Sequence, residues 1–131
     1  MNLEQLSSQY RGARLPQLIE KQIKTLDEPT LLKAIQGTYE NFPREFRPQV
    51  DAYTMAYMKN WFGPNIATVD LGVLFDEAVK DIKSMAAELG VSLNDERLFD
   101  IFNLMVMRLS HFAHTQPDFR KMLGIKKGWF S

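Results

Sequence analysis

Apolar residues recur at three- and four-residue steps along most of the chain, which is the spacing of one face of an α-helix. The first long stripe covers residues 15–26 and the second covers residues 31–42. Because only residues 27–29 separate these stripes, the pattern predicts an antiparallel helical hairpin. Gly37 lies inside the second stripe, where glycine costs about 1 kcal/mol relative to alanine. We therefore expect another helix to approach closely at Gly37.

Two further helices follow this hairpin. The third is expected to begin at Pro48, to carry apolar side chains on two faces, and to end before residues 63–64, a Gly-Pro pair. The fourth, over residues 71–89, has one apolar stripe opposite one charged face. Asp70 is the expected N-cap of this fourth helix, and Gly90 is placed to end it.

The fifth helix is predicted to lie at the centre of the molecule, because nearly every residue from 98 to 113 is apolar. Either Ser92 or Asn94 can cap its N-terminus. Its polar residues form a narrow stripe that we expect to face water, through Asp100, Asn103, Ser110 and His114, with Arg108 and His111 beside it.

The predicted fold is all-α, a compact bundle of about five main helices with short helices at both ends. The short helices are expected near residues 3–10 and 119–123. A chain of 131 residues fits a single domain, residues 1–131, in which residues 125–131 form a basic and aromatic tail. The chain has no cysteine, no apolar leader and no run long enough for a membrane span, so we expect a cytoplasmic protein.

Charge is unevenly distributed, although sixteen basic and sixteen acidic residues cancel. Residues 67–100 hold eight acidic and three basic side chains, a net charge of −5, whereas residues 117–131 carry a net charge of +3. A net charge of zero lacks the overall positive field of a dedicated nucleic-acid-binding protein. The contrast favours an attraction between the two segments, within one chain or between copies.

Two histidines, His111 and His114, lie one turn apart on the fifth predicted helix. Imidazoles at that spacing can share a metal ion, and Asp118 is a third candidate ligand beyond Pro117. Histidines near a helix C-terminus are also favoured by the helix dipole when they are protonated. We favour this second interpretation, and predict no metal and no cofactor.

The fifth helix also concentrates methionine and aromatic residues, with Met105 and Met107 beside Phe99, Phe102 and Phe112. Such a cluster can form a pocket for a small apolar or haem-like ligand, although it more often belongs to the core.

Catalytic patterns find little support in the sequence. The chain has no glycine-rich phosphate loop and no nucleophile elbow. Glu77, Asp81 and Glu88 share one helical face, as paired catalytic carboxylates would, but this is also the ordinary solvated side of an amphipathic helix. The sequence therefore favours a protein that is not an enzyme.

Residues 39–48 form the densest irregular segment, in which Phe42 and Phe46 alternate with Arg44 and Arg47. Aromatic and arginine residues together are typical of binding hot spots and of platforms that stack bases. These four residues are candidate partner-binding residues. The alternative, which we favour, is a connecting corner whose aromatic side chains close the end of the bundle.

The C-terminal segment mixes cations with large apolar side chains. The candidate partner-binding residues here are Arg120, Lys121, Lys126, Lys127, Trp129 and Phe130. A Trp-Phe pair left in water would be unusual at the end of a chain. We therefore predict that residues 125–131 pack against their own subunit or a symmetry mate, with the lysines facing the acidic surface around Glu77, Asp81 and Glu88.

The favoured function is a non-catalytic interaction module that acts by surface docking and forms a homodimer. The apolar surface of the third and fifth predicted helices exceeds what one short bundle covers, and a symmetric pair is the commonest way to bury such a surplus. One alternative is a helical bundle that binds a small apolar or haem-like ligand. Another is a weak nucleic-acid binder that acts through the basic tail; we expect nucleic acid to be an unlikely partner.

Overall fold

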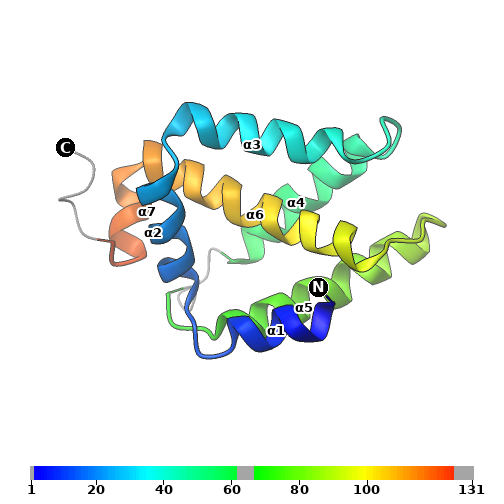
Figure 1. The fold of residues 1–131 in the computed structure, drawn as a ribbon, viewed down its shortest axis with the longest axis horizontal. Coiled ribbons are helices and arrows are strands. Elements are labelled where there is room, and N and C mark those ends of the chain that lie inside the picture. Colours follow the sequence, from blue (N-terminus) through cyan, green and yellow to red (C-terminus); the bar gives the residue numbers. More distant parts are fainter. Residues whose placement is uncertain (1, 62–66, 126–131) are drawn as a thin grey trace.

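Helices account for most of the described chain. The computed structural model describes residues 2–61 and 67–125, and of residue 53 and residues 56–61 it describes the backbone alone. The helices are α1 (Leu3–Tyr10), α2 (Leu15–Thr25), α3 (Glu28–Glu40), α4 (Arg47–Trp61), α5 (Leu71–Glu88), α6 (Asp95–Thr115) and α7 (Pro117–Met122). Five longer helices thus lie between two short ones (Figure 1), and the predicted all-α fold is confirmed over these residues.

Helix α6 is the central element. It packs against α2, α3, α4, α5 and α7, and in Figure 1 it runs between α3 on one side and α1 and α5 on the other. Its buried apolar side chains are at most 4% exposed, and they are Leu98, Ile101, Phe102, Leu104, Met105, Val106, Met107, Leu109 and Ala113. The central position is therefore confirmed. The expected surplus of apolar surface for a second copy rested on α4 and α6 together. Its own subunit covers these side chains of α6, whereas most side chains of α4 lie outside the described part of the chain, so the α4 part of that expectation stays a prediction.

The polar stripe of α6 is less exposed to solvent than the sequence indicates. Ser110 is fully buried, and its hydroxyl lies 2.7 Å from Gln22 Oε1 and 2.9 Å from the carbonyl oxygen of Val106. Gln22 interrupts the apolar stripe of α2, and this contact gives its amide a partner inside the α2–α6 interface. The expectation that Ser110 faces water is therefore wrong.

Local sequence signals set both ends of α5. The Asp70 carboxylate caps the helix, as predicted, and accepts hydrogen bonds from the amides of Gly72 at 2.8 Å and Val73 at 3.4 Å. At the other end, Gly90 has a φ of 70°, and the amide of Val91 donates to the carbonyl oxygen of Ala86 at 2.8 Å. The predicted glycine cap is therefore confirmed.

The first two long helices do not form the predicted hairpin. Helices α2 and α3 pack mainly against α6 rather than against each other, and in Figure 1 α2 runs at a steep angle to α3 instead of alongside it. A short connection limits the distance between two helix ends but leaves their crossing angle to the surface on which both helices pack. The prediction for Gly37 is also wrong, because a Cβ atom built there would meet nothing within 4 Å.

The close approach occurs at Gly72 instead, where the start of α5 meets the turn between α1 and α2. A Cβ atom at Gly72 would lie 3.0 Å from Cγ and 3.2 Å from the amide nitrogen of Arg11. Asp70 joins the same elements, because its Oδ2 accepts from the Gly12 amide at 2.7 Å and lies 3.7 Å from the Arg14 guanidinium. The Gly12 hydrogen bond is the main reason that the pKa of Asp70 is lowered from its ordinary value.

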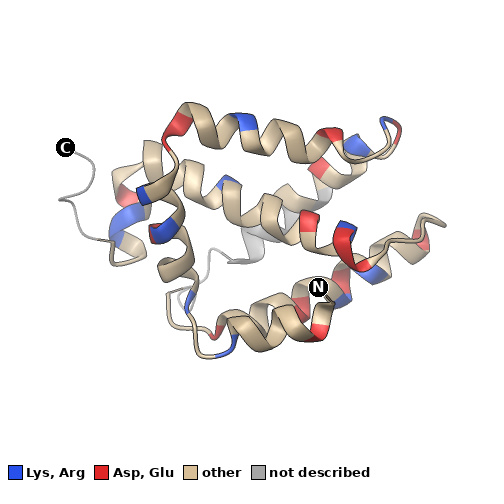
Figure 2. Cartoon of the chain, in the orientation of Figure 1, with Lys and Arg blue, Asp and Glu red and all other residues tan. Residues whose placement is uncertain are grey.

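Charged residues gather at different places along α6. In Figure 2, acidic positions cluster at the first turn of α6, whereas basic positions lie on α7 at the other end. Within residues 2–61 and 67–125, no helix has both the length and the apolar character that a bilayer crossing requires.

Candidate functional site

The end of the molecule where α6 begins is hollowed on two sides. We call this the open end, and define it as residues 41–46 and 89–100. Asn94, one of the two predicted caps, starts α6 by accepting a hydrogen bond from the Arg97 amide at 2.9 Å. Figure 1 shows that the α3–α4 connection and the α5–α6 connection lie at the same end of the molecule as this helix start.

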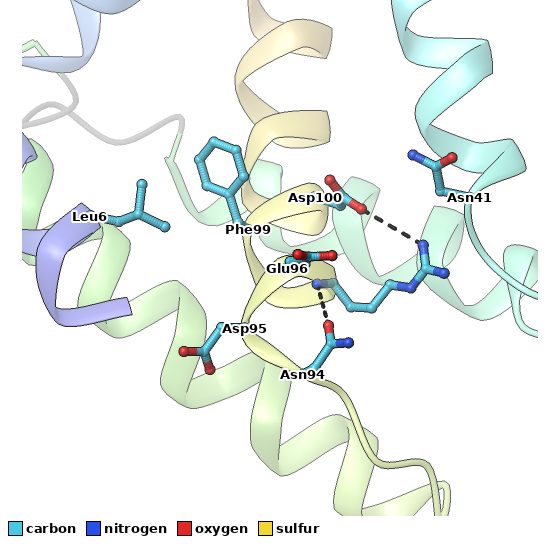
Figure 3. Close-up of a pocket in the computed structure, with 8 residues that line it drawn as sticks. Leu6, Asn41, Asn94, Asp95, Glu96, Phe99 and Asp100 are labelled. Carbon is cyan, nitrogen blue, oxygen red and sulfur yellow. Dashed lines mark hydrogen bonds and ion pairs between the residues drawn. The ribbon is translucent and has the colours of Figure 1, made fainter. Parts of the chain in front are cut away.

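The first hollow, which we call the acidic cleft, has a volume of about 550 Å³. It is lined by Leu6, Asn41, Asn94, Asp95, Glu96, Arg97, Phe99 and Asp100. In Figure 3, Leu6 of α1 and Phe99 of α6 form one side of the cleft, while Asn41, at the end of α3, lies across from them. Three carboxylates thus surround a partly apolar recess.

The second hollow, which we call the end groove, has a volume of about 340 Å³ and a mostly apolar lining. It is lined by Phe42, Pro43, Glu45, Phe46, Val91, Ser92, Leu93, Asn94 and Arg97. The groove separates the α3–α4 corner from the α5–α6 connection. Because Asn94 and Arg97 line both hollows, the end groove and the acidic cleft adjoin at the first turn of α6.

Arg97 and Asp100 form a charged pair between the two hollows. The guanidinium lies 3.8 Å from the Asp100 carboxylate, and its central carbon lies 5.3 Å from the centre of the Phe42 ring. Partial burial raises the pKa of Asp100 above its ordinary value; Arg97 opposes this shift and Glu96 adds to it. Only part of the cost of burying this carboxylate is therefore offset by its basic neighbour.

Most of the candidate partner-binding residues at the α3–α4 corner make their contacts inside their own subunit. Phe42 and Phe46 are 2% and 8% exposed and belong to the core. Arg47 donates to the carbonyl oxygens of Phe42 at 3.0 Å and Glu40 at 3.1 Å, and so satisfies the C-terminal end of α3. Of these four candidates, Arg44 is exposed. The aromatic residues thus close the end of the bundle, although both rings line the end groove.

The candidates near the C-terminus are also divided. Arg120 donates to the carbonyl oxygens of Ala113 at 2.6 Å and His114 at 3.2 Å, and so satisfies the last turn of α6. Lys121 is exposed. The boundary of the tail moves by one residue, because Ile125 is buried and its amide donates to the Arg120 carbonyl oxygen at 3.0 Å. Lys126, Lys127, Trp129 and Phe130 lie outside the described residues, so their docking stays a prediction.

The two histidines contact different partners. His111 Nε2 lies 3.1 Å from Glu28 Oε1, and His114 Nε2 lies 2.8 Å from the carbonyl oxygen of Leu26. The first contact joins α6 to the first residue of α3, and the second joins it to the α2–α3 connection. Asp118 is exposed in the first turn of α7. Within the described part of the chain, no three histidine, aspartate or glutamate side chains come together as a metal site.

Sequence reasoning missed a polar cluster that joins three helices. The Arg108 guanidinium of α6 pairs with Asp51 of α4 and with the hydroxyl of Tyr39 of α3, and that hydroxyl lies 2.8 Å from Asp51. Arg108 also contacts the sulfur of Met55 at 3.4 Å. Burial is the main reason that the pKa of Tyr39 is raised. The sequence feature that could have predicted this cluster is Arg108 itself, because a cation in an otherwise apolar helix needs a polar partner.

A third hollow, of about 930 Å³, lies between α1 and α5. Its lining includes two acidic and two basic side chains, Glu4, Asp76, Arg11 and Lys83, together with the apolar residues Leu3, Phe75 and Val79. These charges balance, so this hollow favours no particular class of ligand. The open end has the clearer combination, an apolar groove with carboxylates around it.

No protein-family model, curated protein or solved structure matches this chain.

Proposed function

We propose that this chain is a non-catalytic interaction module that docks through its open end and pairs as a homodimer. The observation that carries the proposal is the end groove, a mostly apolar recess of about 340 Å³ at a helix start. Leu89, the C-cap residue of α5, is a large apolar side chain that is 45% exposed, two residues before Val91 of the groove lining. Apolar recesses with a charged rim are typical of protein docking sites.

The contacts of the reactive side chains support a structural rather than a catalytic role for them. His114 contacts a backbone carbonyl, His111 contacts Glu28, and Ser110 contacts Gln22. At the open end, Arg97 and Asp100 face each other. Binding that depends on an apolar recess and its charged rim needs none of these groups to react.

Sedimentation velocity over a range of protein concentrations tests the proposal. The polypeptide mass is 15.2 kDa, and we expect a species of twice that mass at micromolar concentration. A monomer at every concentration up to the millimolar range would contradict the homodimer.

Two leucines make a matched comparison of surfaces in the same experiment. Leu89 at the open end and Leu32 near the start of α3 are each 45% exposed. We expect Leu89→Lys to raise the dimer dissociation constant about tenfold, because it places a charge in the interface. Leu32→Lys should leave it unchanged. The opposite pattern would move the docking surface to α3.

A further inference from the structure

We propose that the end groove receives the C-terminal residues 126–131 of a second copy of this chain. This inference rests on the proposed homodimer and identifies its contacts. The segment reads Lys-Lys-Gly-Trp-Phe-Ser. Its aromatic side chains would fill the apolar recess, and its lysines would meet the carboxylates around it. Two copies that exchange tails reciprocally form a closed pair.

The recess has the shape and lining that an aromatic anchor needs. Phe42 and Phe46 form one wall, and Val91 and Leu93 form the other. The half-buried Val91 and Leu93 can lose more of their surface when the groove is filled. Tryptophan is the residue most enriched among binding hot spots, which lie in such pockets with polar residues around them.

Charge complementarity favours this segment as the occupant. Glu45 lines the end groove, and Asp95, Glu96 and Asp100 line the adjoining cleft, where the charged residue of opposite sign is Arg97. The open end therefore carries four carboxylates against one guanidinium among its lining residues. An incoming pair of lysines supplies cations without displacing the contact between Arg97 and the Phe42 ring.

The length of α6 separates the groove from its own tail. Arg120 holds α7 at the last turn of α6, and Figure 1 shows α7 at the end of the molecule opposite the α5–α6 connection. From Asn94 to Ala113 the helix rises about 28 Å, at 1.5 Å per residue. Six fully extended residues span about 20 Å. The tail therefore falls short of its own groove, and a second copy must supply it.

The outer face of α5 is a poorer site for this tail. Its exposed carboxylates, Glu77, Asp81 and Glu88, suit lysines. However, the exposed side chains beside these carboxylates, Lys80 and Ser84, are charged or small, and they offer Trp129 no large apolar surface. The end groove offers both an apolar recess for the tryptophan and nearby carboxylates for the lysines.

Two exposed serines distinguish these surfaces by the same substitution. Ser92 lines the end groove, whereas Ser84 lies on the outer face of α5, within one turn of Asp81 and Glu88. The dimer dissociation constant of the full chain is measured by sedimentation for Ser92→Arg, Ser84→Arg and Trp129→Ala. Circular dichroism and thermal unfolding verify that each variant remains folded.

We expect Ser92→Arg and Trp129→Ala each to raise the dissociation constant about tenfold or more, while Ser84→Arg leaves it unchanged. Mixing Ser92→Arg with Trp129→Ala should restore part of the association, because one intact groove then meets one intact tail. A dimer that withstands both Ser92→Arg and Trp129→Ala overturns this inference and leaves the homodimer standing. Weakening by Ser84→Arg alone overturns it in favour of the α5 face. A wild-type chain that is monomeric throughout overturns the homodimer itself.

Discussion

The two ends of α6 use arginine differently. At the C-terminal end, the Arg120 guanidinium lies 2.6 Å from the carbonyl oxygen of Ala113. At the N-terminal end, the Arg97 guanidinium lies 3.8 Å from the Asp100 carboxylate and lines both the acidic cleft and the end groove. Around Arg120, α7 and the α2–α3 connection cover the helix end, and we call this part of the molecule the closed end. One arginine thus completes a packed helix terminus, and the other remains on a surface that can accept a partner.

This difference separates residues that hold the fold from residues that can bind. A hydrogen bond from a charged group to a partly buried carbonyl contributes about 1.5–3 kcal/mol. A partly exposed ion pair contributes about 0–1 kcal/mol, because water screens it and two side chains must be ordered. We therefore expect stability to depend mainly on the closed end and association mainly on the open end.

The largest expected effect on stability is that of Arg120→Met. This substitution keeps much of the apolar stem and removes the Nη1 group, which donates to both α6 carbonyl oxygens. It should lower the free energy of unfolding by about 2 kcal/mol in urea titrations. Arg97→Met is the matched control, with an expected loss of about 0.5 kcal/mol. Equal losses at the two positions would remove the distinction between the ends.

Two glycines extend the comparison with effects of opposite sign. Gly72→Ala forces a Cβ atom against Arg11 at the α1–α5 junction and should lower the free energy of unfolding by about 1–2 kcal/mol. Gly37→Ala adds a methyl group where nothing lies within 4 Å and should raise it by about 0.5–1 kcal/mol through helix propensity. The same urea titrations measure both. A gain at Gly72 would mean that the junction is loosely packed.

The smallest expected effect concerns two carboxylates near opposite ends of α6. Thr30 donates hydrogen bonds that lower the pKa of Asp27, the N-cap of α3 in the α2–α3 connection, whereas burial raises the pKa of Asp100. The contribution of Asp27 to stability is present above its unfolded pKa and is lost as the pH falls through its folded pKa. For Asp100 the sign is reversed, because protonation relieves the cost of burying its charge. NMR titration of the two side chains should give a lower pKa for Asp27 than for Asp100; the reverse order would contradict this assignment.

Local chemistry made part of this structure predictable. Asp70 and Gly90 act within one helical turn of the ends that they define, and the apolar stretch of α6 required neighbours on every side, so the sequence alone predicted these features. The sequence could not reveal that Arg108 meets Tyr39 and Asp51, because these partners lie 69 and 57 residues away. The close approach at Gly72 escaped prediction for the same reason.

The open end illustrates the same limit for the site. Its aromatic and arginine residues were singled out by composition, but the helix packing decides that Phe42 and Phe46 line a groove while Arg47 satisfies a helix end. Residues 91–94 and Arg97, which complete that groove, had no sequence signal beyond a helix cap. Their role depends on their distance from the α3–α4 corner, which only the folded chain defines.

Amide hydrogen exchange of the full chain tests most directly whether the open end is the docking surface. Exchange is compared at protein concentrations well below and well above the dimer dissociation constant. We expect the higher concentration to slow exchange in residues 41–46 and 89–97, and to leave the α2–α3 connection and α7 unchanged. Protection that appears at the closed end instead, or no change with concentration at the open end, would contradict the account.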